Sequence, residues 1–232
     1  MQGLGRVAQR TPIGVKGANA DRQEMDQSSL NIGEQIAVDF FAKHDMRCMR
    51  FTDQEMRQGK TPDFRVFKST EFVLYSEAKH IQEDTWLKDQ LNAAPPMTLV
   101  GGSRHDPAHN RLSAHIHQAA KQFQAANPGR EYPNVLVFTS SDRGCMFTDL
   151  ISTLTGNFYA ESGAIDPIYK NISDGRIRDE KYTIDLYVFK DDFPGGREKE
   201  HIYFQNKGSK HYFRLCELLG SDPSLHKVIP QS

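Results

Sequence analysis

Apolar residues along this chain follow two different periods, and the changes between them divide the sequence into helices and strands. Through NIGEQIAVDFFAKHD they recur at helical spacing, as at Ile32, Ile36 and Phe40. Serine is a favoured residue just before a helix, because its hydroxyl accepts a hydrogen bond from a free backbone N–H group. We therefore predict a helix that begins after a cap at Ser28 or Ser29.

Four shorter runs have the composition of strands, and a second amphipathic helix separates the last of them from the others. The run NVLVFTS is almost uniformly apolar, as expected of a strand that is covered on both faces. The sequence predicts strands at 47–52, 62–67, 71–79 and 134–140, and a helix at 111–126 that the Asn-Pro-Gly sequence at 127–129 ends.

The C-terminal part predicts a further helix at 147–154, a hairpin, and a last helix. The hairpin joins TIDLYVFK to HIYFQN through DFPGGREKE, and the last helix, SKHYFRLCELL, ends at Gly220. The segment 81–110 contains several helix-breaking sequences and is predicted to be a long irregular connection.

These elements predict a single α/β domain at 28–220. Its core, about 28–140, has the order helix, three strands, helix, strand, and a mixed C-terminal extension follows at 141–220. The segment 1–27 is rich in Gly, Gln, Arg and Ala without periodicity, so we expect a flexible tail there, and a second tail at 221–232.

Composition narrows the class of protein without identifying it. The 232 residues are 38% hydrophobic and 25% charged, as in soluble globular proteins, and the net charge is -1. This near-neutral charge argues against avid non-specific binding of polyanions but leaves room for a local basic groove. No apolar run approaches the length of about 18 residues that a membrane span needs. The N-terminal segment lacks a secretory apolar core and the three cysteines are widely spaced, so we expect reduced thiols and a cytoplasmic location.

Charged residues occupy the ends of two otherwise apolar strands in the stretch TPDFRVFKSTEFVLYSEAKH. Asp63 opens the first strand, whereas Glu77 and Lys79 close the second. Because residues two apart in a strand point the same way, Glu77 and Lys79 should share one face, and Val73 and Tyr75 should continue it. Charges at the end of such a strand must be paired, solvated or bound to a metal.

If the two strands pair, Asp63 lies beside Glu77 and the two carboxylates repel each other unless a cation binds between them. Mg²⁺ suits such a pair, because it prefers oxygen ligands and keeps waters that substrate phosphate can replace. A bound metal would activate water and polarise a phosphoryl oxygen. Lys79 would stabilise the charge that develops in the transition state.

The sequence Pro62-Asp63, followed after thirteen residues by Glu77-Ala78-Lys79, resembles the core motif of the PD-(D/E)XK nuclease superfamily. The resemblance implies a restriction-endonuclease-like fold for about residues 28–140. It further implies a metal-dependent nuclease that hydrolyses phosphodiester bonds in nucleic acid, with DNA favoured over RNA. Mg²⁺ or Mn²⁺ would be bound by Asp63, Glu77 and the carbonyl of Ala78, and Lys79 would be catalytic.

Three further residues are assigned to the site by this resemblance alone. The family often has an acidic residue on its first helix, which would be Glu34 here, as a further catalytic residue. It often has polar residues on its second helix, which would be Gln118 or Lys121 here, as contacts to nucleic acid. Many enzymes of this kind act as dimers, so a homodimer is also an expectation.

Other interpretations of the same residues stay open. Glu77 and Lys79 could form an ordinary ion pair at a solvated strand end, and Gln118 and Lys121 could belong to an exposed helix face. A protein with this fold could also lack catalysis and serve as a module that binds nucleic acid or protein. These alternatives are separated by metal binding and by activity.

Four histidines between residues 105 and 117 suggest a different class of protein, a zinc site or a small-molecule enzyme. They are His105, His109, His115 and His117. His115 and His117 are two apart on a predicted helix and do not face each other, and no cysteine is near. Solvated histidines or contacts to phosphate are the simpler interpretation. Trp86, the only tryptophan, could stack on a base or anchor its loop to the domain.

Overall fold

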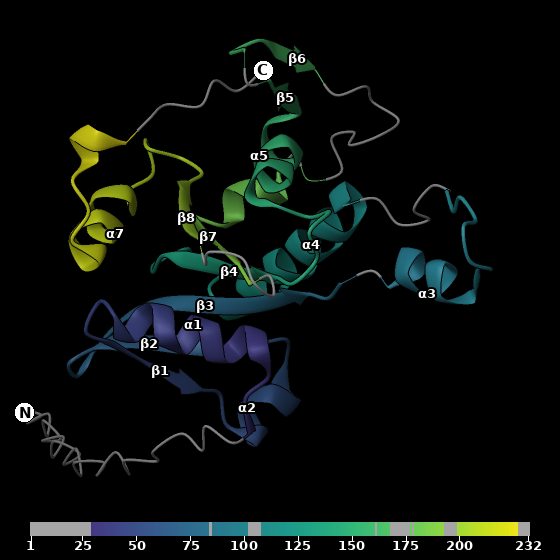
Figure 1. Ribbon diagram of the computed structural model, residues 1–232. Helices are drawn as coiled ribbons and strands as arrows, with labels where there is room; N and C mark the ends of the chain where they lie inside the picture. Colours follow the sequence, from purple (N-terminus) through teal and green to yellow (C-terminus); the bar gives the residue numbers. More distant parts are fainter. Residues whose placement is uncertain are drawn as a thin grey trace, which may run out of the picture.

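The computed structural model is a mixed α/β structure built on one six-stranded sheet, with a separate two-stranded ribbon (Figure 1). Strand order in the large sheet is β1-β2-β3-β4-β7-β8. The structure describes residues 29–83, 85–101, 108–160, 162–167, 177, 179–192 and 199–226. The tail predicted at 1–27 therefore lies outside the described residues.

The described helices and strands have the following bounds. The α-helices are α1 (Ile32–Ala42), α2 (Asp53–Gln58), α3 (Trp86–Ala93), α4 (Ala108–Ala126), α5 (Phe147–Thr155) and α7 (Tyr212–Leu219). The strands of the large sheet are β1 (Met46–Arg50), β2 (Phe64–Lys68), β3 (Glu71–Ile81), β4 (Asn134–Ser140), β7 (Leu186–Asp191) and β8 (Lys199–Phe204). The ribbon consists of β5 (Asn157–Tyr159) and β6 (Ile165–Pro167), and short 3-10 helices occur at η2 (Glu180–Thr183) and η3 (Pro223–Leu225).

The first half of the sheet is an antiparallel meander, and the second half begins with parallel strands. β1 pairs with β2 and β2 pairs with β3, both antiparallel. The chain then crosses through α4 and returns in β4, which is parallel to β3. β7 is parallel to β4, and β7 and β8 form the predicted antiparallel hairpin. The predicted order of helix, three strands, helix and strand is present, with α2 and α3 inserted.

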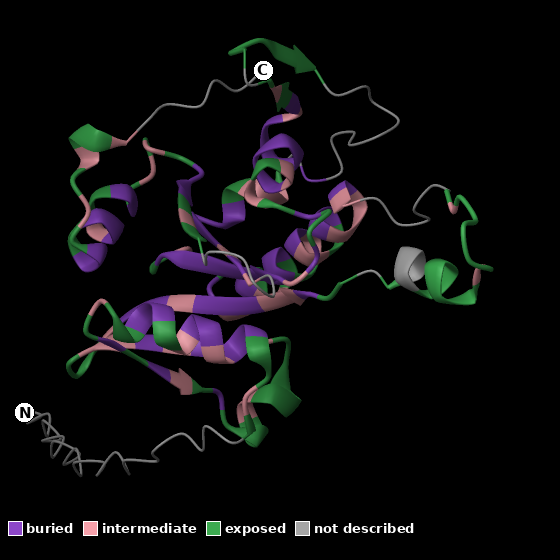
Figure 2. Cartoon of the chain, viewed as in Figure 1, coloured by how far each residue is buried: buried purple, intermediate pink, exposed green. Residues whose placement is uncertain are grey.

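Two apolar layers cover the sheet. On one side α1 and α7 pack against it, and on the other side α4 and α5 pack against it. β4 supplies both layers, because Val135 and Val137 face the first while Leu136 and Phe138 face the second. Every residue of β4 is buried, which confirms the prediction from its uniform apolar run, and the strand is purple throughout in Figure 2.

The structure corrects three predictions about local structure. α1 is capped by Asn31 and not by a serine: its side chain accepts from the Glu34 N–H group, and the Glu34 carboxylate accepts from the Asn31 N–H group. The segment 81–110 is not irregular throughout, since it contains α3 and the first turn of α4. Short helix α2 was not predicted, because its sequence lacks apolar periodicity; a capping box between Thr52 and Glu55 begins it.

A β-bulge corrects the predicted facing of Val73. The register between β2 and β3 shifts where Val66 pairs with Leu74 and Phe67 pairs with Phe72. The extra residue places Val73 with Leu74 in the apolar layer beneath α1, on the side opposite to Glu77. Beyond the bulge the alternation resumes, so the prediction for the end of β3 is unaffected.

The C-terminal helix packs as its sequence predicted. The apolar side of α7 joins the layer shared with α1, and the helix ends at Gly220, which adopts the left-handed conformation with φ of 61°. The folded chain continues past 220, because the imidazole of His226 contacts Tyr212 and stacks on Phe204 at 4.7 Å. All three cysteines are buried thiols outside any disulfide, as expected. None of the helices in the described part of the chain has the length and apolar character of a membrane span.

Candidate active site

Asp63 and Glu77 are joined through the backbone at the point where β2 begins. The ladder between β2 and β3 starts with Phe64 opposite Ser76, so Asp63 lies one residue before it. Its backbone N–H group donates to Oε2 of Glu77 at 2.9 Å, and the Ala78 N–H group donates to Oδ2 of Asp63 at 2.8 Å. The two carboxylates thereby extend the strand pairing beyond its last backbone hydrogen bond.

Lys79 completes this group on the α4 side of the sheet. Its Nζ atom lies 2.5 Å from Oε1 of Glu77, as an ion pair between residues two apart on β3. The Glu77 side chain is 0% exposed and the Lys79 side chain 13% exposed. Sequence alternation predicted this shared face. A buried carboxylate with two donors, one of them a half-buried ammonium, is a partly desolvated group that can act on substrate charge.

Burial raises the pKa of both carboxyl groups, and a neighbouring negative charge adds to the shift in each case. The pKa of Glu77 is raised to about 7, first by burial and then by the charge of Asp63, although Lys79 opposes the shift. The pKa of Asp63 is also raised, chiefly by burial, while the Ala78 N–H group and Lys79 act to lower it. A titratable pair with raised pKa values is a feature of functional sites more often than of surface ion pairs.

Glu34 lies close enough to this pair to influence it. Its negative charge is among the causes that raise the pKa of Asp63. The Oε2 atom of Glu34 also accepts an ion pair from Arg50 at 2.5 Å, in addition to the capping hydrogen bond from Asn31. The structure thus brings the predicted acidic residue of the first helix to the edge of the sheet that carries Asp63, with Arg50 as a partner that the sequence did not predict.

Gly33 permits the close approach of α1 to the end of β3. A Cβ atom at this position would lie 3.3 Å from both Cβ and the backbone nitrogen of His80, the residue after Lys79. Contacts of this length are tighter than ordinary van der Waals packing, so a larger residue would push the helix away. The absence of a side chain at Gly33 therefore keeps Glu34 near the two carboxylates.

The carbonyl group of Ala78 lies on the side of β3 that faces Asp63. In a strand the N–H and C=O groups of one residue project to the same side. Because the Ala78 N–H group donates to Asp63, its carbonyl also projects toward the start of β2. The three predicted ligand groups of Asp63, Glu77 and Ala78 are therefore neighbours.

The polar residues of the second helix behave differently from one another. Gln118 and Lys121 are both exposed on α4, and among the described residues neither is seen in contact with the carboxylates. Gln122 instead donates to the carbonyl of Thr61 at 2.9 Å, within the segment that carries Asp63. The remaining amide oxygen of Gln122 is buried without a described hydrogen-bond partner. Gln122 was not among the site residues predicted from the sequence. Its position four residues after Gln118, on the same helix face, is the sequence feature that could have indicated it.

The donor set fits a hard divalent cation and does not fit zinc. It consists of carboxylate and carbonyl oxygens, which Mg²⁺ and Mn²⁺ accept while retaining several waters. No group of three or more His, Cys, Asp or Glu side chains arranged for a metal occurs among the described residues. A cation at Asp63 and Glu77 would thus be held by few protein ligands, and it would relieve the repulsion by Asp63 that contributes to the raised pKa of Glu77.

The histidine cluster is dispersed in the part of the chain that the structure describes. His109 contacts the Thr153 hydroxyl at 2.9 Å, and His117 lies 3.2 Å from a carboxylate oxygen of Glu180. The His115 ring packs near Phe138, at 6.2 Å between centroids. His105 and the side chain of Trp86 lie outside the described residues, so the predictions for them stay predictions.

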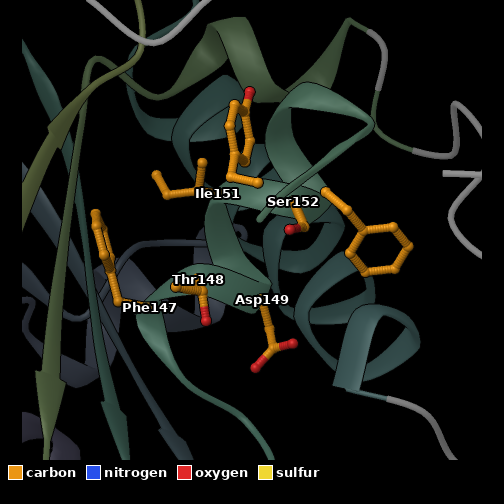
Figure 3. Close-up of a pocket in the computed structure, with 7 residues that line it drawn as sticks. Phe147, Thr148, Asp149, Ile151 and Ser152 are labelled. Carbon is orange, nitrogen blue, oxygen red and sulfur yellow. The ribbon is translucent and has the colours of Figure 1, made fainter. Parts of the chain in front are cut away.

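A pocket of about 480 Å³ lies over α5 and β5, and its lining includes none of the predicted site residues (Figure 3). Its carboxylate, Asp149, accepts a hydrogen bond from the Met146 N–H group at 2.8 Å and so caps α5. Aromatic side chains flank the pocket at Phe147 and Phe158. Neither a paired nucleophile and base nor a second carboxylate is among its lining residues, so this pocket offers no equivalent of the group formed by Asp63, Glu77 and Lys79.

Comparison of the chain with protein-family models, with curated proteins and with solved structures finds no match.

Proposed function

We propose that this chain is a divalent-metal-dependent nuclease that hydrolyses phosphodiester bonds in nucleic acid, with DNA as the favoured substrate. The observation that carries this proposal is the juxtaposition of Asp63, Glu77 and Lys79 where β2 begins and β3 ends. The order of α1, three strands, α4 and β4 supports a restriction-endonuclease-like core, because that fold places its motif at the same strand ends.

Asp63, Glu77 and the Ala78 carbonyl would hold Mg²⁺ or Mn²⁺. The bound ion would lower the pKa of a water molecule and polarise a phosphoryl oxygen. To bind it, Glu77 must turn one oxygen from its present donors, the Asp63 N–H group and Lys79. At neutral pH the uncomplexed Glu77 retains part of a proton, since its pKa is raised to about 7, so cation binding would release protons.

The residues of the chain divide the remaining tasks between them. In hydrolysis a water oxygen bonds to phosphorus, one ester P–O bond breaks, and a water proton ends on the leaving oxygen. Lys79 would donate a hydrogen bond to the phosphoryl oxygen that gains charge, and Glu77 holds its ammonium in place. Glu34 adds negative charge beside Asp63. Gln122 fixes the segment before Asp63 through the Thr61 carbonyl.

A cleavage assay on the purified chain tests the proposal. Labelled linear duplex, circular and single-stranded DNA, and RNA, would be incubated with Mg²⁺, Mn²⁺ or EDTA. We expect cleavage that requires metal and that falls at least about 100-fold in Asp63→Asn and Lys79→Met, since each removes charge from the transition state. Asn at position 63 keeps an acceptor for the Ala78 N–H group, so the fold should survive.

The matched control for Lys79→Met is Lys43→Met. Lys43 is an exposed lysine at the C-terminal end of α1, away from Glu34, and it pairs with Glu200. The Lys43→Met variant should cleave as wild type does. Denaturation curves for each variant separate lost chemistry from lost folding. Undiminished, metal-dependent cleavage by folded Asp63→Asn would overturn the proposal.

One observation favours a second function, a nuclease-like module that binds nucleic acid or protein without cleaving. Both carboxylates accept backbone hydrogen bonds at the junction of β2 and β3, so they have a structural use without chemistry. Titration calorimetry distinguishes the two functions. A nuclease should bind Mn²⁺ with heat that Asp63→Asn abolishes, whereas a silent module should show no such heat.

A further inference from the structure

An aromatic strip lies on the part of the sheet that precedes the two carboxylates. We use this name for Phe51, Phe67, Phe72, Tyr75 and Tyr132. Phe72 is the centre of the strip, with ring centroids 4.3 Å from Tyr132, 4.8 Å from Tyr75 and 5.5 Å from Phe67. Tyr75 in turn stacks with Phe51 at 6.2 Å and an interplanar angle of 15°. The rings therefore form a continuous row across β2 and β3.

This row lies on the face opposite α1, at the margin of the second apolar layer, against which Tyr75 packs. That layer, beneath α4 and α5, includes no buried residue of β1 or β2. Phe67, Phe72 and Tyr75 are half-buried, and Tyr132 is 36% exposed. Figure 2 shows half-buried pink segments on β2 and β3, in contrast to the purple of β4. The strip is thus reachable from solvent along part of its length.

Two arginines belong to the same face. The guanidinium of Arg65 lies 4.0 Å from the ring centroid of Phe51 and pairs with Glu55 at 2.5 Å. Arg47 is exposed and pairs across the strands with Phe67. Its guanidinium has no carboxylate partner among the described residues, which leaves it available to a phosphate. Aromatic rings interleaved with arginines are a surface that suits both the bases and the backbone of nucleic acid.

The strip continues directly into the candidate active site. Tyr75 precedes Glu77 by two residues on β3 and shares its face, a separation of about 7 Å along a strand. A nucleotide whose base stacks on the strip would therefore place a neighbouring phosphate within reach of Asp63, Glu77 and Lys79.

We propose that the aromatic strip is a stacking platform for unpaired bases, so that the substrate is single-stranded DNA or a single-stranded segment of it. This inference rests on the proposed nuclease function. Bases in a duplex are stacked on one another and present only their edges, whereas unpaired bases can lay their faces on aromatic side chains. A sheet surface with rings and few arginines favours unpaired bases over the duplex backbone, which demands a denser array of positive charge.

Binding measured in EDTA tests this without any need for cleavage. Fluorescence anisotropy would compare a labelled single strand of about 15 nucleotides with the duplex of the same sequence. Each would be titrated with the full chain. The variants are Tyr132→Leu and Phe72→Leu, which keep apolar volume but lose the aromatic ring; Tyr132→Phe keeps the ring. Phe213→Leu is the control, because Phe213 is 70% exposed on α7, outside the strip.

We expect the wild type to prefer the single strand. Each leucine variant should weaken that binding by about fivefold or more, the loss of one stacked base, with Tyr132→Phe and Phe213→Leu unchanged. Equal binding by the folded leucine variants, preference for the duplex, or no binding by wild type would each overturn the platform. If the chain cleaves in a metal-dependent manner but the leucine variants bind the single strand as wild type does, the nuclease function stands and the stacking platform is rejected. If binding depends on the rings but no cleavage occurs, the platform stands and the nuclease function is rejected.

Discussion

The raised pKa of Glu77 should make the folded state less stable as the pH rises. Between its ordinary pKa of 4.5 and its folded value of about 7, the folded chain keeps a proton that the unfolded chain releases. Stability decreases with rising pH wherever the folded state binds more protons than the unfolded state. The loss therefore begins near pH 4.5 and is complete above pH 7. At about 1.36 kcal/mol per pKa unit, the difference corresponds to about 3 kcal/mol for this fully buried side chain.

Urea denaturation in EDTA at pH 5 and pH 8 measures the effect, with Glu77→Gln as the comparison. The glutamine variant does not ionise, so its free energy of unfolding should fall less between the two pH values, by about 3 kcal/mol. Titrating groups distant from Glu77 contribute to both proteins and cancel in the difference, whereas Asp63, which interacts with Glu77, does not. Parallel pH dependence of wild type and variant would refute the inference that a buried, repelled carboxyl group occupies this position.

The same experiment with a divalent cation connects stability to the proposed function. Mn²⁺ at 100 times its dissociation constant should stabilise the folded state by about 2.7 kcal/mol at pH 8. At pH 5 protons compete for Glu77, so stabilisation by the same concentration should be smaller.

Two further predictions concern positions that support the site and the core. Gly33→Ala should reduce cleavage by about tenfold, because its Cβ atom would lie 3.3 Å from atoms of His80 and displace α1. Gly59→Ala is the control, since a Cβ atom there would have no neighbour within 4 Å. Equal loss of cleavage in both variants would contradict the explanation. Phe123→Ala should lower the free energy of unfolding by about 3–5 kcal/mol because Phe123 is 0% exposed, while the same change at Phe213, 70% exposed, should have little effect in urea denaturation.

The sequence predicted the elements whose patterns arise from one dominant environment. β4 lies between two apolar layers, so its uniform run was sufficient to identify it. The amphipathic helices α1, α4 and α7 were predicted for the same reason. The ribbon of β5 and β6 and the short helix α2 were not predicted, because strands of three residues and a helix of six are too short to show an apolar period.

The candidate site was predictable where it depends on neighbours in the chain. Alternation along β3 was sufficient to place Glu77 and Lys79 on one face. The bulge at Val73 could not be predicted, because it depends on how β2 and β3 adjust their register. The contacts of Gln122 with Thr61 and of Arg50 with Glu34 join residues from different elements, and no local pattern encodes them.

The hydrogen bonds that join Asp63 and Glu77 to the backbone have an evolutionary consequence. Each carboxylate satisfies an N–H group next to the other, beyond the last paired residues of β2 and β3. Substituting either one by a residue without an acceptor leaves a donor unsatisfied at this strand end, whether or not any substrate is cleaved. A lineage that abandoned catalysis would still be selected to keep both acids for folding, and Lys79, which makes no such backbone contact, would be the first of the three to drift.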